Sequence, residues 1–285
     1  MANMALGNRP PSKFIRRLNQ VSAGVAAKIG FRAQRAEEIP ALLIVVTLPS
    51  LEPKLAEAAV NGGAGALQVR MNLQDEPGDA QVLERLLKAA GDCPCGVVLA
   101  GTSGASLDRI ESWRLAGIDY VVLGSDSDPA YLGISGLGKV IALDYTVDRD
   151  LVRTVNDLPF DAVQASIAGP DDVGKPLAIR EVMGYRYVSL TVRKPVVVQA
   201  DYRIQPRDVG ALREARVEGL AIDVTEMGSD AESIRKATAE FAQAVKALGR
   251  ARGRTAAPIY PTVPLFQPGR ETTGVPEEEP EPGEE

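Results

Sequence analysis

Eight short runs rich in valine, isoleucine and other apolar residues alternate with helix-like stretches, and this alternation predicts an α/β fold, a single (β/α)8 TIM barrel. The runs begin 20 to 34 residues apart, which leaves room for one helix between neighbouring parallel strands. The series fills residues 40–249, close to the lower size limit of such a barrel. Apolar residues make up 45% of the chain and charged residues 25%, the balance of an ordinary folded domain.

The strands are expected where β-branched residues gather. In chain order they are residues 41–47, 66–71, 96–102, 120–126, 140–144, 162–166, 196–201 and 220–225. Helices are expected at residues 51–61, 79–90, 106–116, 177–192, 206–217 and 230–248, and most end beside a glycine. Residues 187–192 alone have the pattern of a strand. The apolar residues from 177 to 192 follow a helical spacing, so we interpret the whole segment as a helix.

The N-terminal arm, residues 1–39, is basic: its first 35 residues hold seven Lys and Arg and no Asp or Glu. Residues 12–29 within it have the spacing of an amphipathic helix. One interpretation is an arm that binds a membrane surface or a nucleic acid. We favour the other, a helix that closes the N-terminal mouth of the barrel, and expect no nucleic-acid partner.

The C-terminal segment, residues 250–285, is rich in Pro and Glu. Residues 255–285 contain seven of the 20 prolines and carry a net charge of −6, so the preceding 254 residues are neutral overall. Such a composition cannot bury enough apolar surface to fold, and a disordered acidic tail is expected. Its partner is left open.

Absent residue types exclude several classes of site. There is no His, which removes Ser-His and Cys-His nucleophile pairs, His-ligated zinc and an imidazole base. The two cysteines, Cys93 and Cys95, are too few for a disulfide framework or a metal site. With no signal peptide and no apolar run long enough to span a membrane, a cytoplasmic protein is expected. A homo-oligomer is compatible with the composition.

Alternation within the strands predicts which side chains face the barrel interior, because successive side chains of a strand point to opposite faces. In residues 66–71 the apolar Leu67 and Val69 pack on helices, so Gln68 and Arg70 face inward. The other strands likewise place polar residues inside near their carboxyl ends, the end at which catalytic TIM barrels carry their sites.

The expected ligand-binding residues are Arg70, Gln68, Thr47, Thr102, Gln164, Ser166, Gln199 and Thr225. Arg70 would hold a carboxylate or phosphate. The candidate acids and bases are Asp144, Asp201 and Asp223, and two of these, Asp144 and Asp223, are candidate ligands for a divalent cation such as Mg²⁺. The competing interpretation is a network in which these groups satisfy one another and only stabilise the barrel.

Two stretches carry a resemblance to known families. Residues 61–70, Asn-Gly-Gly-Ala-Gly-Ala-Leu-Gln-Val-Arg, resemble the second βα unit of phosphosugar aldolase and synthase barrels. Residues 194–198, 207–215 and 218–222 resemble the seventh and eighth units of phosphate-binding and flavin-binding TIM barrels. The resemblance implies a phosphate or a flavin at the carboxyl end of the barrel. Here the two turns that hold phosphate in those families contain Asp201 and Glu226, and no strand ends in the Lys that an imine-forming aldolase needs.

The sequence therefore predicts a barrel that binds a small anionic metabolite, a carboxylate or a phosphate, at its C-terminal mouth. A metal-assisted lyase or isomerase step is the expected chemistry. The first alternative is a non-catalytic scaffold or binding module that acts through its charged termini. The second is a flavin-binding barrel, with flavin less favoured than Mg²⁺.

Overall fold

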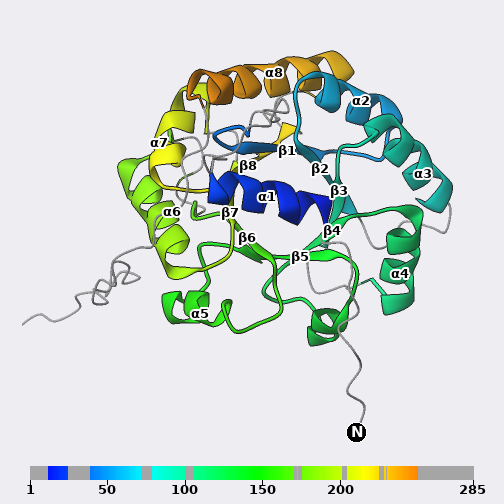
Figure 1. Cartoon of the computed structure of the whole chain (residues 1–285), viewed down its shortest axis with the longest axis horizontal. Coiled ribbons are helices and arrows are strands. Elements are labelled where there is room, and N and C mark those ends of the chain that lie inside the picture. Colours follow the sequence, from blue (N-terminus) through cyan, green and yellow to red (C-terminus); the bar gives the residue numbers. More distant parts are fainter. Residues whose placement is uncertain are drawn as a thin grey trace, which may run out of the picture. The chain divides into compact units, whose positions relative to one another are not determined.

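The computed structural model describes residues 12–24, 39–71, 79–99, 105–169, 172, 175–200, 204–224, 228 and 230–249 (Figure 1). The strands are β1 Leu43–Leu48, β2 Ala66–Met71, β3 Cys95–Leu99, β4 Tyr120–Leu123, β5 Gly138–Leu143, β6 Ala162–Ala165, β7 Val196–Ala200 and β8 Gly219–Asp223. The α-helices are α1 Lys13–Ala23, α2 Pro53–Asn61, α3 Asp79–Ala90, α4 Leu107–Ala116, α5 Arg149–Thr154, α6 Ile179–Thr191, α7 Val209–Glu214 and α8 Ala231–Ala247.

The eight strands form a closed parallel barrel in the order β1 to β8, with β8 paired to β1. The (β/α)8 prediction is confirmed. Following paired residues once around the barrel, from Thr47 through Gln68, Gly96 and Tyr120, leads back to β1 eight residues earlier, at Ile39. This slip of eight is the shear of a TIM barrel.

The connections between strands differ in their helical content. Each strand except β4 is followed by an α-helix, and β4 is followed by the short 3-10 helix η1, Pro129–Gly133. The ambiguous segment 177–192 is helical, as predicted, over Ile179–Thr191. The predicted helix 206–217 is wrong in its extent: a 3-10 turn, Pro206–Asp208, precedes α7, and Arg216 with φ 57° ends the helical backbone.

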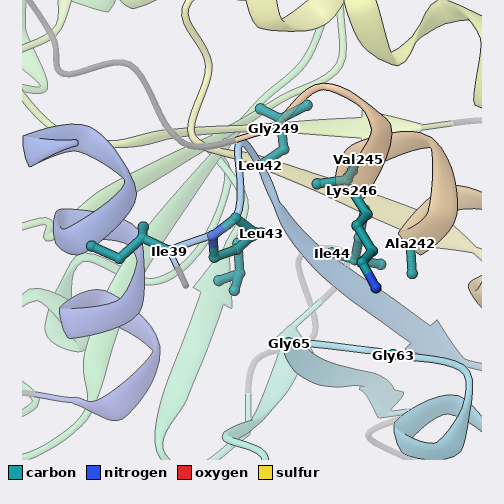
Figure 2. Close-up of a pocket in the computed structure, with 11 residues that line it drawn as sticks. Ile39, Leu42, Leu43, Ile44, Gly63, Gly65, Ala242, Val245, Lys246 and Gly249 are labelled. Carbon is teal, nitrogen blue, oxygen red and sulfur yellow. The ribbon is translucent and has the colours of Figure 1, made fainter. Parts of the chain in front are cut away.

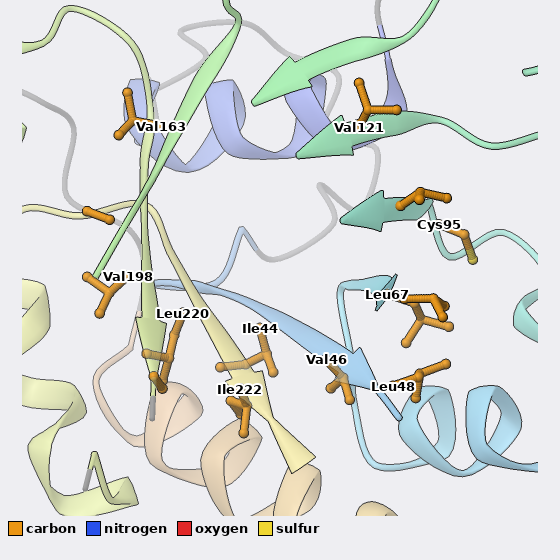
Figure 3. Packing of buried hydrophobic residues seen from close by; sticks show 14 of the residues in the cluster. Ile44, Val46, Leu48, Leu67, Cys95, Val121, Val163, Val198, Leu220 and Ile222 are labelled. Atoms are coloured by element: carbon orange, nitrogen blue, oxygen red, sulfur yellow. The ribbon is translucent and has the colours of Figure 1, made fainter. Parts of the chain in front are cut away.

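The outer core lies between the strands and the helices that surround them. Figure 3 shows side chains of this layer, among them Ile44, Leu67, Val121 and Val198, all fully or almost fully buried. These residues alternate with the inward-facing ones, as the parity of the strands predicts.

The inner core is a second cluster that combines inward-facing strand residues with helix α1. Phe14 and Leu18 of α1 pack with Val45, Tyr120 and Val197 of the strands, and the Phe14 and Tyr120 rings stack at 4.0 Å. Tyr120 is fully buried, and its hydroxyl donates to the Leu67 carbonyl at 2.8 Å.

Helix α1 closes the N-terminal end of the barrel, as we favoured (Figure 1). The Asp119 carboxylate, which precedes β4, accepts hydrogen bonds from the Ser12 hydroxyl and from the backbone N–H groups of Lys13 and Phe14. Arg17 donates to the Gly65 carbonyl, just before β2. The predicted helix 12–29 is too long, because α1 ends at Ala23 and Gly24 adopts φ 64°. Residues 25–29 lie outside the described residues.

Within the described part of the chain, no helix is both long and apolar enough to cross a membrane. The predicted disordered tail, residues 250–285, lies outside the described residues.

Candidate functional site

The carboxyl end of the barrel interior is built in layers. The register slips by eight residues over eight strands, so residues at the same height along the barrel axis are displaced by one residue from the hydrogen-bonded partner on each next strand. The inward side chains of each layer therefore come from alternate strands. The outermost layer, which we call the mouth layer, consists of Arg70, Gly124, Ser166 and Asp223. The floor layer below it consists of Thr47, Val98, Ala142 and Gln199. A third layer consists of Gln68, Val122, Gln164 and Ala221.

An ion pair joins two members of the mouth layer. Arg70 of β2 and Asp223 of β8 approach to 2.6 Å between a guanidinium nitrogen and Oδ2. Since β1 lies between these two strands, the pair spans the carboxyl end of β1 and covers Thr47, which is buried. The Arg70 side chain remains 54% exposed while that of Asp223 is 10% exposed. A buried carboxylate thus holds a cation whose outer face is open to solvent.

Two amide hydrogen bonds connect the floor layer to the layer beneath it. Gln68 Nε2 donates to Thr47 Oγ1 at 2.8 Å, on β2 and β1. Gln164 Nε2 donates to Gln199 Oε1 at 2.6 Å, on β6 and β7. Because Gln199 accepts through its oxygen, the group that it can still present is its Nε2 donor.

The network does not satisfy itself completely. Gln68 is 1% exposed, and its Oε1 has no hydrogen-bond partner within the part of the chain that the structure describes. A buried polar atom without a partner costs about 1–3 kcal/mol. This cost counts against a purely structural role for the polar residues at this end of the barrel.

The opposite half of the mouth is lined by small residues. Gly124 and Ser166 face the ion pair across the mouth layer, and a Cβ added at Gly124 would have its nearest neighbour at 3.9 Å. Below them, Val98, Ala142 and Gln199 are partly exposed, in contrast to the buried Thr47. Solvent therefore reaches the floor layer on the side away from Arg70 and Asp223.

The structure brings together six of the predicted site residues: Thr47, Gln68, Arg70, Gln164, Gln199 and Asp223. Ser166 directly follows β6, and its N–H donates to the Leu143 carbonyl. Asp144 directly follows β5 and is exposed. Its Oδ1 accepts from the Thr146 N–H at 2.9 Å and from the Thr146 hydroxyl, so this carboxylate caps a turn.

Thr102, Asp201 and Thr225 lie outside the described residues. Among the residues that are described, no group of three or more acidic or cysteine side chains is placed to hold a metal ion.

Sequence reasoning missed the apolar residues of the site. Val98, Ala142 and Gly124 share the inward face with the polar residues, and strand parity alone could have found Val98 and Ala142. The parity of the predicted strand 120–126 also puts Gly124 on the inward face, although in the structure β4 ends at Leu123 and residues 124–127 form a turn.

A hollow lies near the N-terminal end of the barrel, outside the strands. It has a volume of about 410 Å³ and is lined mainly by apolar residues of β1 and α8 and by glycines before β2. Figure 2 shows Val245 and Lys246 of α8 beside Ile44 of β1. Among the described residues of its lining, Lys246 is the one charged residue, so this lining offers little to orient a polar ligand.

No protein-family model matches the sequence, and no curated protein matches it. Solved structures match the fold. Thiamine phosphate pyrophosphorylase from Pyrococcus furiosus aligns with a TM-score of 0.54 and 21% identity, over 73% of this chain and 96% of that one. Tryptophan synthase from Mycobacterium tuberculosis aligns with a TM-score of 0.56 and 16% identity, over 72% and 92% of the two chains. A mutant tryptophan synthase alpha-subunit from Pyrococcus furiosus gives 0.53 and 13%, over 73% and 100%. At these identities the likeness establishes the TIM-barrel fold alone.

Proposed function

We propose that the protein binds a small anionic metabolite, a carboxylate or a phosphate, at the carboxyl end of its barrel, with Arg70 as the principal anion ligand. The observation that carries this proposal is the Arg70–Asp223 pair, in which a buried carboxylate orients a half-exposed guanidinium. An arginine in this state can form charge-assisted hydrogen bonds to a carboxylate or phosphate. The Ser166 hydroxyl and Gln199 Nε2 are further donors at the same end of the barrel.

The structural neighbours support an anionic ligand in a general way. One of them carries a phosphate compound in its name, thiamine phosphate pyrophosphorylase. In TIM-barrel enzymes the site lies at the end of the barrel where Arg70 and Asp223 lie.

Asp223 is the proposed catalytic acid or base. An anion bound to Arg70 would place the ligand beside the Asp223 carboxylate, which would take a proton from the ligand and return it. A lyase or an isomerase needs such a group, and a chain without His must draw it from a carboxylate or another titratable side chain. The Mg²⁺ site predicted at Asp144 and Asp223 has no three-residue ligand set among the described residues.

The test compares anion binding by the wild-type chain, by Arg70→Met and by Arg193→Met. The control Arg193 is exposed and lies two residues after α6, at the N-terminal end of the barrel, so its loss removes the same charge far from the mouth. We expect at least one of four anions, acetate, benzoate, methyl phosphate and phenyl phosphate, to bind the wild type. At a concentration of about ten times its Kd, that anion should raise the wild-type Tm by about 3 °C. Arg70→Met should weaken that binding about tenfold to a hundredfold, because it removes charge-assisted hydrogen bonds worth about 1.5–3 kcal/mol. Arg193→Met should bind as the wild type does.

Mass spectrometry of small molecules that co-purify with the native protein would name the ligand. If none of the four anions binds the wild type and no anion co-purifies, the proposal is wrong. In that case the polar residues form a structural network, and Asp223→Asn should then lower the Tm strongly without any effect on a ligand.

A further inference from the structure

The polar residues at the carboxyl end of the barrel occupy one side of it. Arg70, Asp223, Thr47, Gln68, Gln164 and Gln199 lie on five consecutive strands, from β6 through β7, β8 and β1 to β2. The inward positions of the other three strands, β3, β4 and β5, hold Val98, Val122 and Ala142 at the corresponding heights. The interior of the barrel at this end is therefore half polar and half apolar.

Part of the apolar half is open to solvent. Val98 and Ala142 are partly exposed although they point into the barrel, whereas Val122 beneath them is buried. Among the described residues, the mouth layer above them has the small residues Gly124 and Ser166 on that side, and a Cβ added at Gly124 would have its nearest contact at 3.9 Å, with the Ser127 hydroxyl oxygen. Apolar surface exposed at the end of a barrel is surface that a ligand can cover with a gain in free energy.

The exposed apolar residues Val98 and Ala142 lie at nearly the same height along the barrel axis as Arg70. The mouth layer and the floor layer come from alternate strands and differ in height by one residue, a step of about 3 Å along a strand. An anionic group on Arg70 and an apolar group on Val98 and Ala142 would therefore belong to one compact molecule. The size of these side chains leaves most room beside Ala142, next to Gly124 and Ser166.

We infer that the ligand is an amphipathic anion: a small carboxylate or phosphate with a compact apolar or aromatic group attached close to the charge. Its anionic group lies on Arg70, and its apolar group covers Val98 and Ala142. This inference rests on the proposed anion site and adds the chemistry of the other half of the ligand.

The experiment compares two matched pairs of probes, phenyl phosphate with methyl phosphate and benzoate with acetate. Within each pair the anionic group is the same, and the two members differ by an aromatic ring against a methyl group. Affinities are measured by titration calorimetry on the full chain. We expect the aromatic member of the pair that binds to bind about tenfold more tightly, the gain from removing roughly 55 Å² of apolar surface from water.

Two variants locate this gain. Ala142→Leu fills the apolar half, and we expect it to abolish the tenfold preference for the aromatic member of the pair. Ala211→Leu adds the same bulk at an exposed position of α7 and should leave the preference intact. Val98→Thr keeps the volume of the side chain and replaces a methyl with a hydroxyl group. It should therefore reduce the preference for the aromatic probe severalfold, and it tests the same surface if Ala142→Leu lowers the Tm.

The outcomes separate the two proposals. Equal affinity for both members of each pair, or a preference that survives both Ala142→Leu and Val98→Thr, overturns the amphipathic ligand and leaves the anion site standing. If no probe binds to the wild type, the anion site fails, and the inference about its apolar half fails with it.

Discussion

Gly96 lies at a crowded point of the barrel interior. A Cβ at this position would lie 2.4 Å from two ring atoms of Tyr120, far inside van der Waals contact. The Tyr120 ring cannot withdraw, because it is fully buried, stacks on Phe14 and donates its hydroxyl hydrogen to the Leu67 carbonyl. One large aromatic residue opposite a glycine thus fills the centre of the barrel above α1.

Replacing this glycine should be costly. We expect Gly96→Ala to lower the free energy of unfolding by about 3 kcal/mol, the upper range for overpacking a core, measured by urea denaturation. Gly133→Ala is the control, because a Cβ there meets no atom within 4 Å. If the two variants were equally stable, the Tyr120 ring would be free to move and this account of the interior would be wrong.

The pair Cys93 and Cys95 shows how burial determines the behaviour of a reactive residue type. Burial raises the pKa of the Cys93 thiol to about 11 and that of Cys95 further. Both thiols are therefore protonated at neutral pH and behave as small apolar side chains. They lie at the N-terminal end of β3, the opposite end of the strand from Val98 and the mouth of the barrel.

At the scale of elements, tertiary contacts decide the role of α1. Its sequence is amphipathic, a pattern equally typical of a helix on a membrane surface. The deciding contacts come from residues distant in sequence: the Asp119 carboxylate at its N-terminus and the barrel interior around Tyr120. The helix thereby becomes part of the inner core.

A charge placed on the buried face of α1 should therefore destabilise the whole protein. Leu18 is fully buried in the inner core and Asn19, its neighbour, is exposed. We expect Leu18→Asp to lower the free energy of unfolding by at least about 3 kcal/mol, because it buries an unpaired carboxylate, while Asn19→Asp changes it by less than about 0.5 kcal/mol. Chemical denaturation followed by circular dichroism measures both. Similar stability of the two variants would mean that α1 is dispensable for the barrel.

Helix α6 illustrates a local ambiguity that was resolved correctly. Residues 187–192 have a strand-like composition, yet Tyr185, Val188 and Ser189 are buried with a helical spacing. The Ser189 hydroxyl donates at 2.7 Å to the carbonyl of Ala215, beyond α7, so the helix is also anchored from outside its own segment.

At the scale of the whole molecule, the net charge and the barrel belong to different parts of the chain. The described elements of the barrel end with α8 and Gly249, whereas the net charge of −6 arises from residues 255–285. Residues 1–254 carry 31 basic and 31 acidic groups. We interpret the segment after the barrel as a separate acidic extension.

Ending the chain after Arg254 should leave the barrel intact. We expect the Tm to change by less than about 2 °C, because the truncation removes no residue of the described core. The shortened chain should also elute much earlier from an anion-exchange column near pH 7, since its net charge is zero. A large fall in Tm would show that residues 255–285 stabilise the barrel and would contradict this division of the chain.

The sequence by itself determined the fold class, the number and order of the strands, and which side chains point inward within the described strands, because these follow from periodicity and spacing within single segments. Tertiary structure decided which inward residues meet. The pairing of Arg70 with Asp223, the covering of Thr47 and the division into a polar and an apolar half all depend on the height of each strand relative to the others. That height is set by the register of eight strand pairs and the shear that closes them, a property of the whole ring that no single segment contains. The sequence showed that the chain has no His. The structure adds that the charged groups Arg70 and Asp223 meet at the mouth of the barrel.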